Sequence, residues 1–353
     1  MTSNKPIKLP LSLAEVDRAA HLRLDDEYLK KAWLTAQVLQ FQDEKFLSID
    51  NQVKFIEGKQ LGEYQSQSDY FLGVDYVKNS MPNSPEAKEI STHYFVRNYL
   101  GDLSADGDSE NKSENKSGNK SGNKSGNKSG KKIVVNEVAN ENLRTLREIG
   151  AFLSPRDIGL SVHAQGLANW HKKHPRCSQC GAATTVISGG SVRRCLIDQS
   201  EHYPRTDSAI IVLVKDDQDR VLLGRQKVWP KNRFSTFAGF VEPGESFEHC
   251  VVREVAEEAG VKLNKINYLG SQPWPFPSSL MIAFEAVTEN PLDARPDGDE
   301  IEEIRWFTRA EMKQAIIDAT LILPLNISVA RQMINGWYGD NAVTDLKGAE
   351  SWR

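Results

Sequence analysis

Carboxylates gather on one short predicted helix of this chain, directly behind a turn rich in glycine and proline. The segment over 239–261 reads GFVEPGESFEHCVVREVAEEAGV, and its apolar spacing predicts a helix over 247–259. Glu254 and Glu258 are four residues apart and share one face of that helix, and Glu257 joins the same edge. Because adjacent carboxylates repel one another and hard cations prefer oxygen ligands, the pattern predicts a site for Mg²⁺ or Mn²⁺.

The turn before this helix and the residues around it have features that would hold the carboxylates in place. Gly239 and Gly244 permit a tight loop, and Gly260 stands where a helix normally ends. Arg253 is placed to clamp the carboxylate of Glu245 and hold the loop on the helix. A solvated acidic helix face is the simpler interpretation, but it does not account for these neighbours.

The spacing of the whole segment resembles the Nudix signature at every defined position, from Gly239 through Glu245, Arg253, Glu254, Glu257 and Glu258 to Val261. The resemblance implies metal-assisted hydrolysis of a nucleoside diphosphate linked to another moiety. It also implies the α+β class, with a mixed β-sheet in an α/β/α sandwich and the signature as a loop, helix and loop beside the sheet.

A second motif, SQPWPFPSS over 271–279, follows the acidic segment by ten residues. Its three prolines stiffen the backbone, so the sequence predicts neither an ordinary strand nor a helix there. Trp274 and Phe276 offer flat apolar surface for a base or ring, although such a loop can also simply pack on a sheet. The motif resembles the one that marks the NADH pyrophosphatase branch of the Nudix family, which implies that it selects the substrate.

A metal site of a different kind is predicted upstream. Cys177 and Cys180 form a CxxC pair and Cys195 follows, an arrangement that resembles the zinc ribbon of the same branch. A structural zinc ion takes four ligands, and the fourth cysteine is absent here; Asp198 or His202 remain as candidates. A ribbon that folds without metal is the alternative. Cys250, on the acidic helix, is interpreted as a packed core residue.

Composition sets broad limits. The chain has 353 residues with a net charge of −4, which gives no global signal for DNA or a membrane surface and allows two or three domains. Four cysteines, three of them clustered, argue against a secreted disulfide protein. With no apolar run of signal-peptide or membrane-spanning length, we expect a cytoplasmic protein.

The order of apolar segments divides the chain. We expect a divergent small α+β domain over 1–165, interrupted at about 109–132 by a linker-like repeat of Ser-Gly-Asn-Lys that contains no apolar residue. A zinc-ribbon-like module over 166–205, the Nudix domain over 206–340 and a tail over 341–353 follow. A helix is predicted over 157–173, and a hairpin with strands at 209–214 and 221–223 opens the Nudix domain.

The resemblance also implies roles for particular residues. Divalent metal ligands are expected at Glu254, Glu257, Glu258 and Glu300, with Glu257 accepting the proton of the attacking water and Glu245 and Arg253 as further residues of the catalytic site. Substrate contacts are expected at Ala238, Phe240, Gln272, Pro273, Trp274, Pro275, Phe276, Pro277, Ser278, Ser279 and Ala330.

The expected reaction is hydrolysis of the pyrophosphate of NADH or NAD to NMNH or NMN and AMP, with Mg²⁺ or Mn²⁺ as cofactor and zinc as a structural ion. Resemblance also suggests NAD-capped RNA as a substrate and a homodimer as the assembly. Two alternatives stay open. One is a Nudix hydrolase of different specificity, acting on ADP-ribose, dinucleoside polyphosphates or coenzyme A. The other is a non-catalytic nucleotide- or RNA-binding protein, which would be expected to lack the glutamates of the signature.

Overall fold

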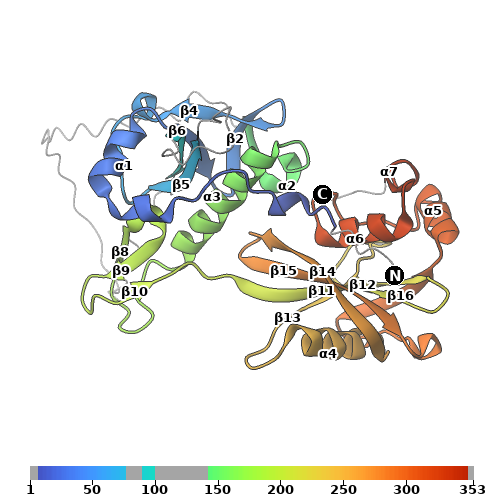
Figure 1. Ribbon diagram of the computed structural model, residues 1–353. Helices are drawn as coiled ribbons and strands as arrows, with labels where there is room; N and C mark the ends of the chain where they lie inside the picture. The colour runs from blue at the N-terminus through green and yellow to red at the C-terminus, as the bar shows by residue number, and fades with distance from the viewer. Residues whose placement is uncertain (1–6, 77–89, 100–141, 349–353) are drawn as a thin grey trace, which may run out of the picture.

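The computed structural model describes residues 7–76, 90–99 and 142–348 (Figure 1). Three sheets follow one another along the chain. The repeat predicted at about 109–132 lies outside the described residues. No helix in the described ranges is long and apolar enough to cross a membrane.

The first sheet belongs to the N-terminal domain and has the strand order β3-β2-β1-β6-β5, with β4 paired to β1 and β7 to β2. Its fully buried aromatic side chains, among them Tyr70, Phe71 and Phe95, form the centre of the domain. The elements are α1 (Asp26–Trp33), β1 (Gln37–Gln42), β2 (Lys45–Ile49), β3 (Gln52–Val53), β4 (Phe55–Glu57), β5 (Asp69–Tyr76), β6 (Ile90–Tyr99), β7 (Leu143–Thr145) and α2 (Leu146–Ile149), with 3₁₀ turns η1 (Pro10–Ser12), η2 (Ala20–Leu24) and η3 (Gly58–Leu61).

A long helix, α3 (Pro155–Lys173), connects this domain to the rest of the chain. It begins two residues before the predicted start, because Ser154 caps it and Pro155 occupies the first turn. Its apolar residues pack into the N-terminal core. The expected domain boundary between 165 and 166 therefore falls inside one continuous helix.

The second sheet is a three-stranded antiparallel ribbon in the order β10-β9-β8. Its strands are β8 (Thr184–Ile187), β9 (Val192–Cys195) and β10 (Glu201–His202), and the 3₁₀ turn η5 (Ser188–Gly190) joins the first two. The CxxC pair precedes β8 and Cys195 ends β9, so the fold brings the three cysteines to one end of the ribbon.

The third sheet has the order β14-β15-β11-β12-β16, with β13 paired to β11, and it is mixed because β11 and β15 run parallel. Helix α4 covers one face and α5 and α6 lie on the other (Figure 1). This is the predicted α/β/α sandwich. Its elements are β11 (Asp207–Lys215), β12 (Val221–Gln226), β13 (Phe237–Phe240), α4 (Phe247–Ala259), β14 (Leu263–Trp274), β15 (Ser279–Thr288), η6 (Pro291–Asp293), β16 (Ile301–Phe307), α5 (Arg309–Ile317), α6 (Val329–Tyr338) and α7 (Ala342–Asp345).

Strand β11 shows how the sequence produces these layers. Its alternate side chains point to opposite faces, as the period of a strand requires. Ile210 and Val212 pack in the core beside α4, whereas Ile211 and Leu213 pack in the core beside α6. The predicted hairpin of β11 and β12 is present, with Val214 opposite Leu222.

Both ends of the described chain are fixed to this third sheet. Leu9 is buried in the core beside α6, and the amide of Leu11 donates to the side chain of Gln272 at 3.0 Å. Leu346, directly after α7, is fully buried in the same core. The segment expected to be a tail from 341 therefore begins with packed structure.

Candidate active site

The acidic helix has the predicted bounds, because local signals define both of its ends. Ser246 accepts a hydrogen bond from the amide of His249 at 3.2 Å and caps the first turn. Gly260 adopts a left-handed conformation with φ of 69°, which lets its amide bond back to Ala256 and end the helix. These ends fix which carboxylates share the inner face.

Glu258 is the most deeply buried carboxylate of the group, with 4% of its surface exposed. Burial, together with the charges of Glu300, Glu254 and Asp297, raises the pKa of Glu258 to about 8. Its Oε2 atom has no hydrogen-bond partner among the described residues. A buried carboxylate oxygen without a partner, surrounded by like charges, is a position that a cation would stabilise.

Glu254 and Glu258 both belong to α4, and the carboxylate of Glu254 lies against Gly239 of β13. A methyl group at Gly239 would come within 1.9 Å of the Glu254 carboxylate, so only glycine leaves room for that side chain against the strand. Burial is the main cause that raises the pKa of Glu254, and the charges of Glu257 and Glu300 add to it. The glycine at position 239 thus has a steric reason in this chain.

Glu300 reaches the group from the segment before β16. Its charge raises the pKa of both Glu254 and Glu258, and its Oε1 accepts a hydrogen bond from Gln226 at 2.6 Å. Asp297 positions the same segment by accepting from the amides of Asp299, Glu300 and Ile301. The sequence motifs do not point to Asp297, although the Asp-Gly pair at 297–298 is a turn signal.

Arg253 joins the turn to the helix. Its Nε and Nη2 donate to the two carboxylate oxygens of Glu245 at 2.8 and 2.9 Å, and Arg253 lowers the pKa of that carboxyl to about 2. Its Nη1 donates to Glu254 at 2.8 Å and to Glu257 at 3.1 Å. Glu257 is 61% exposed, so it lies at the rim of the group, away from the buried pair.

The carboxylates fit a hard divalent cation. Oxygen ligands of the required kind come together from α4 and from the segment before β16, and the buried oxygen of Glu258 lacks any other partner among the described residues. Glu254, Glu258 and Glu300 are the residues that would hold such an ion, with Glu257 beside them.

Phe240 ends β13 with 60% of its surface exposed, so its ring is free to contact a ligand beside the acidic group. Ala238 lies two residues before it on the same strand, opposite Ile211. Ala330 is buried on α6, and its side chain packs in the core that Ala238 also contacts. Any contact of Ala330 with a ligand would therefore be made by its backbone.

The proline-rich motif differs from its predicted structure. The expectation that it forms no ordinary strand is wrong for its first half, because Gln272, Pro273 and Trp274 belong to β14 and pair with β15. Strand β14 lies at the edge of the sheet, where a residue without an amide hydrogen is tolerated. Residues 275–278 form the turn into β15.

The side chain of Gln272 forms its hydrogen bonds within the protein. It is fully buried, accepts from the amide of Leu11 at 3.0 Å and donates to the carbonyl of Ile327 at 2.9 Å. It therefore ties the N-terminal segment to the loop before α6. Any direct contact between Gln272 and substrate would require these bonds to break.

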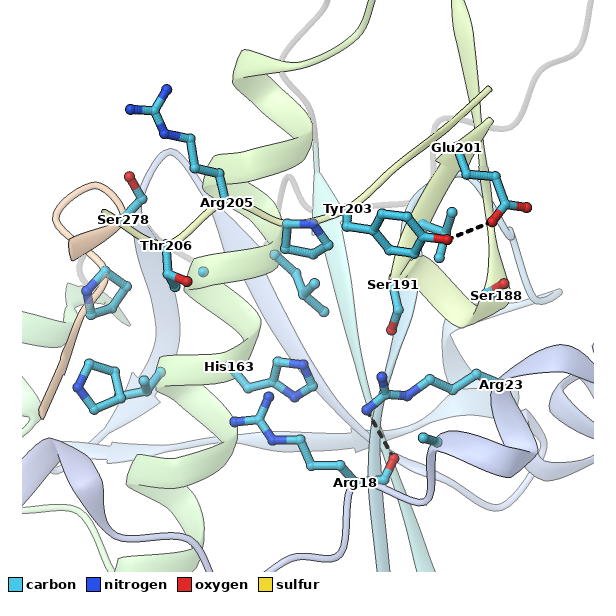
Figure 2. A pocket seen from close by; sticks show the side chains of 18 of the residues that line it. Arg18, Arg23, His163, Ser188, Ser191, Glu201, Tyr203, Arg205, Thr206 and Ser278 are labelled. Carbon is cyan, nitrogen blue, oxygen red and sulfur yellow. Dashed lines mark hydrogen bonds between the residues drawn. The ribbon is translucent and has the colours of Figure 1, made fainter. Parts of the chain in front are cut away.

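The rest of the motif is held by α3 and α2. Gln165 and Asn169 donate to the carbonyl of Pro275 at 2.8 and 2.9 Å, and Asn169 also donates to the carbonyl of Pro277 at 3.0 Å. The guanidinium of Arg147 lies 4.2 Å from the centre of the Phe276 ring and 5.5 Å from that of Trp274. Other motif residues, Ser278 and Ser279, line a cavity beside the ribbon (Figure 2).

The ribbon gathers four candidate zinc ligands. The ligand atoms of Cys177, Cys180, Cys195 and Asp198 all lie within 4.8 Å of one another. The sulfurs of Cys180 and Cys195 are 3.5 Å apart, and Cys177 Sγ lies 3.4 Å from Asp198 Oδ2. Tetrahedral zinc with bonds of about 2.3 Å to sulfur needs separations near these values, so the group fits the metal.

Of the two candidates for the fourth ligand, the structure places Asp198 in the cluster and His202 next to it. The Nε2 of His202 lies 3.2 Å from Ser200 Oγ instead. Cys250, on α4, is fully buried against β13, as expected of a core residue.

The matches to family models divide the chain into the same ribbon and third-sheet regions that the structure shows. Residues 204–323 match the NUDIX domain, and residues 172–203 match the NADH pyrophosphatase zinc ribbon domain. The fold assignment rests on these matches and on the observed mixed sheet. A NUDIX hydrolase structure from Nitrosomonas europaea is also similar, at 25% identity and a TM-score of 0.33, covering 38% of this chain and 78% of that one.

Among curated proteins, the chain is 42% identical over 200 residues to the NAD-capped RNA hydrolase NudC of Mycobacterium bovis. It is 34% identical over 225 residues to the human NAD-capped RNA hydrolase NUDT12. The matches cover 54% and 58% of this chain, and they span 64% of the bacterial and 48% of the human relative.

Proposed function

Because the chain carries a Nudix domain directly behind an NADH pyrophosphatase zinc ribbon domain, we propose that it is a metal-dependent pyrophosphatase. Its substrate is NADH or NAD, and its products are NMNH or NMN and AMP. The observation that carries the proposal is the buried oxygen of Glu258, which lacks a partner among the described residues and lies among carboxylates on the Nudix helix.

Glu254, Glu258 and Glu300 would hold the divalent cation. When bound, Mg²⁺ or Mn²⁺ neutralises phosphate charge and lowers the pKa of a coordinated water. Arg253 holds the loop on the helix through Glu245, so these carboxylates are positioned before the substrate arrives. The Gly239 backbone lets Glu254 lie against β13, which fixes the distance between the helix and the strand.

Glu257 accepts a proton from the attacking water. Its exposed position at the rim of the acidic group supports this role, since a base must reach both the water and bulk solvent. The oxygen of the water forms a bond to one phosphorus atom, and the P–O bond of the bridging oxygen breaks. The bridging oxygen leaves on the other phosphate, so one water is consumed for each pair of monophosphates.

Phe240 stacks on a ring of the substrate. Its exposure at the end of β13, directly after the glycine against which Glu254 packs, places a flat apolar surface beside the carboxylates. Trp274 and Phe276, held by Arg147, α3 and the sheet edge, form the wall that selects the dinucleotide.

NAD-capped RNA is the second candidate substrate. The names of the bacterial and human relatives support it, and the reaction on the cap is the same pyrophosphate hydrolysis. The same proposal includes a homodimeric assembly and a cytoplasmic location. It also includes structural zinc in the cluster of Cys177, Cys180, Cys195 and Asp198. Four cysteines that are all free in this structure support the location.

Product analysis tests the function. The protein is incubated with NADH, NAD, ADP-ribose and NAD-capped RNA, each with Mg²⁺ or Mn²⁺, and the products are separated by chromatography. NMNH and AMP that disappear when chelator is added are expected. Cleavage of ADP-ribose alone would contradict the role given to the proline-rich motif. No turnover of any of the four would favour a nucleotide-binding protein instead.

A further inference from the structure

Three glutamates are assigned to the divalent cation, and one of them differs from the others in how it is held. Glu254 and Glu258 are fixed by the geometry of α4, because residues four apart on a helix share a face. Glu300 comes from the segment before β16, so contacts with other parts of the chain must decide where its carboxylate lies. The acidic helix alone cannot set the position of this third ligand.

The backbone of Glu300 is fixed from two sides. Asp297 accepts hydrogen bonds from the amides of Glu300 and Ile301 at 3.3 and 2.8 Å, which closes a turn. The carbonyl of Glu300 accepts from the amide of Lys227, the residue that follows β12, at 3.3 Å. The main chain around Glu300 is thus tied to the end of β12.

The side chain of Glu300 is held much less firmly. It is exposed, so packing does not restrict its rotamers. Burial, and then the charge of Glu300, raise the pKa of Glu258, so the two carboxylates repel each other while no cation lies between them. Without a contact to oppose it, this repulsion would turn Glu300 toward solvent.

Gln226 supplies the only hydrogen bond that the side chain of Glu300 forms within the described residues. Its Nε2 donates to Glu300 Oε1 at 2.6 Å. An ionised carboxylate only accepts hydrogen bonds, so the NH₂ group of the amide must face it. The bond uses one carboxylate oxygen of Glu300 and leaves the other for a cation.

An irregularity in the third sheet directs Gln226 toward this segment. Arg225 of β12 stands opposite Glu303 of β16. A regular antiparallel ladder would therefore place Gln226 opposite Glu302. Instead Gln226 pairs with Ile301, and Glu302 is the extra residue of a β-bulge. Bulges redirect side chains and are common beside active sites, and this one moves Gln226 one residue toward the segment that carries the third ligand.

Arginines engage the other carboxylates of the bulge. Arg225 forms an ion pair with Glu302, and its Nε lies 3.6 Å from Glu303 Oε2. Arg305 Nη2 lies 2.7 Å from Glu303 Oε1. No ion pair within the described ranges includes Glu300. Glu302 and Glu303 therefore stabilise the bulge, whereas the charge of Glu300 stays available to a cation.

The donor at position 226 is neutral, which suits a neighbour of a metal ligand. A lysine or arginine there would also hold Glu300, but its positive charge would repel an incoming cation. An amide orients the carboxylate and leaves its charge intact. Hydrogen bonds from outer residues to metal ligands commonly change metal affinity by about 10- to 100-fold.

We propose that Gln226 is a positioning residue for the divalent cation, whose amide holds Glu300 toward Glu254 and Glu258 and leaves one oxygen of Glu300 to bind the ion. The proposal rests on the cation site of the proposed function, but it does not depend on which dinucleotide is the substrate. The bulge at Glu302 gives Gln226 the register that this bond requires.

Binding of Mn²⁺ to the full chain tests the proposal. Free Mn²⁺ is measured by electron paramagnetic resonance with zinc-loaded protein, so that the ribbon cysteines are occupied. Gln226→Met keeps the length of the side chain and removes the donor, and we expect it to weaken Mn²⁺ binding about tenfold. The Mn²⁺ concentration that gives half of the maximal NADH turnover should rise by the same factor. Gln226→His keeps a neutral donor and should lose less affinity than Gln226→Met.

A double substitution shows whether Gln226 acts through Glu300. Glu300→Gln alone should weaken Mn²⁺ binding, and adding Gln226→Met to it should have no further effect. Gln218→Met is the matched control, because Gln218 is an exposed glutamine in the turn between β11 and β12; Mn²⁺ binding should not change. Melting without Mn²⁺ checks that every variant folds.

Unchanged Mn²⁺ affinity in Gln226→Met would overturn the proposal. Equal losses from this substitution with Glu300 and with Gln at position 300 would also overturn it, because Gln226 would then not act through that carboxylate. A wild type that binds no Mn²⁺ would overturn both the proposal and the cation site. Mn²⁺ binding that depends on Gln226, in a protein that does not cleave NADH, would overturn the proposed function alone.

Discussion

The acidic group around Glu258 and the buried pair of Asp69 and Arg97 use charge in opposite ways. In the N-terminal sheet, Arg97 donates to Asp69 at 2.6 Å through both Nε and Nη2, and its other donors bond the carbonyls of Leu61 and Glu63. Around Glu258 like charges adjoin, and one buried oxygen has no partner among the described residues.

The charges of Asp69 and Arg97 support the fold, whereas the charges around Glu258 would be balanced by a bound ligand. A buried pair whose charges are bonded to each other and to backbone carbonyls offers little for another molecule to contact, and removing one partner leaves a buried charge uncompensated. A group of like charges with an unused oxygen gains only when an ion of opposite sign arrives. Substitutions in the two regions should therefore affect different measurements.

Glu258→Gln should have the largest effect on activity. We expect turnover of NADH to fall about 10³-fold or more, since stabilisation by a bound metal is worth several kcal/mol and each 1.4 kcal/mol is about tenfold. Without metal, the melting temperature near pH 7 should not fall, because Glu258, with a pKa of about 8, is then largely uncharged and Gln keeps its shape. Glu248→Gln, an exposed change on the same helix, is the control. A melting temperature far below that of the wild type would show instead that Glu258 supports the fold.

Asp69→Asn should have the reverse effect. We expect a loss of about 3 to 5 kcal/mol in the free energy of unfolding, because the Arg97 charge stays buried without its partner. The turnover number of the folded fraction should remain near that of the wild type. Urea unfolding and NADH assays measure the two quantities. Glu27→Gln breaks an exposed pair and should cost less than about 1 kcal/mol; equal losses in both variants would contradict the distinction.

Glu257→Gln compares an exposed glutamate of the acidic group with the buried Glu258. Loss of a general base should reduce turnover by about 10²-fold, less than at the buried position. Because the side chain is 61% exposed, stability should be unchanged. Rates near those of the wild type would remove Glu257 from the mechanism.

Stability should also depend on pH when no metal is bound. The pKa of Glu258 is about 8 in the folded protein and near 4.5 ordinarily, so its protonated form favours folding. Stability from this group is fully present below about pH 4.5 and is lost as the pH rises through about 8, with one pKa unit worth about 1.4 kcal/mol. Urea unfolding in chelator from pH 5 to 9 should show this slope, and Glu258→Gln should flatten it.

Local signals explain what the sequence predicted well. Helix α4 has its predicted bounds because Ser246 and Gly260 define them within the segment itself. The alternation of β11 and its polar turn likewise predicted the hairpin. The cysteine spacing pointed to a site whose ligand atoms the ribbon brings within 4.8 Å.

Partners distant in sequence explain what it missed. Gln272 is buried because Leu11 and Ile327 supply its hydrogen bonds, and no pattern around 272 reveals either partner. The prediction for the proline motif failed because the tolerance for Pro273 depends on β14 being an edge strand, which is a property of the whole sheet. The cavity beside the ribbon is likewise formed by several separate segments.

The position of Leu9 has a consequence for how the chain is made. Leu9 is synthesised long before α6, yet it is buried in the same core as Ile334 and Trp337 of that helix. At about 5 to 20 residues per second, a ribosome needs roughly 15 to 60 s to produce the roughly 300 residues between them. During that interval the apolar side chain of Leu9 cannot pack in its core, because α6 has not yet been synthesised. The core beside α6 is thus completed by a segment that is synthesised long before α6 itself.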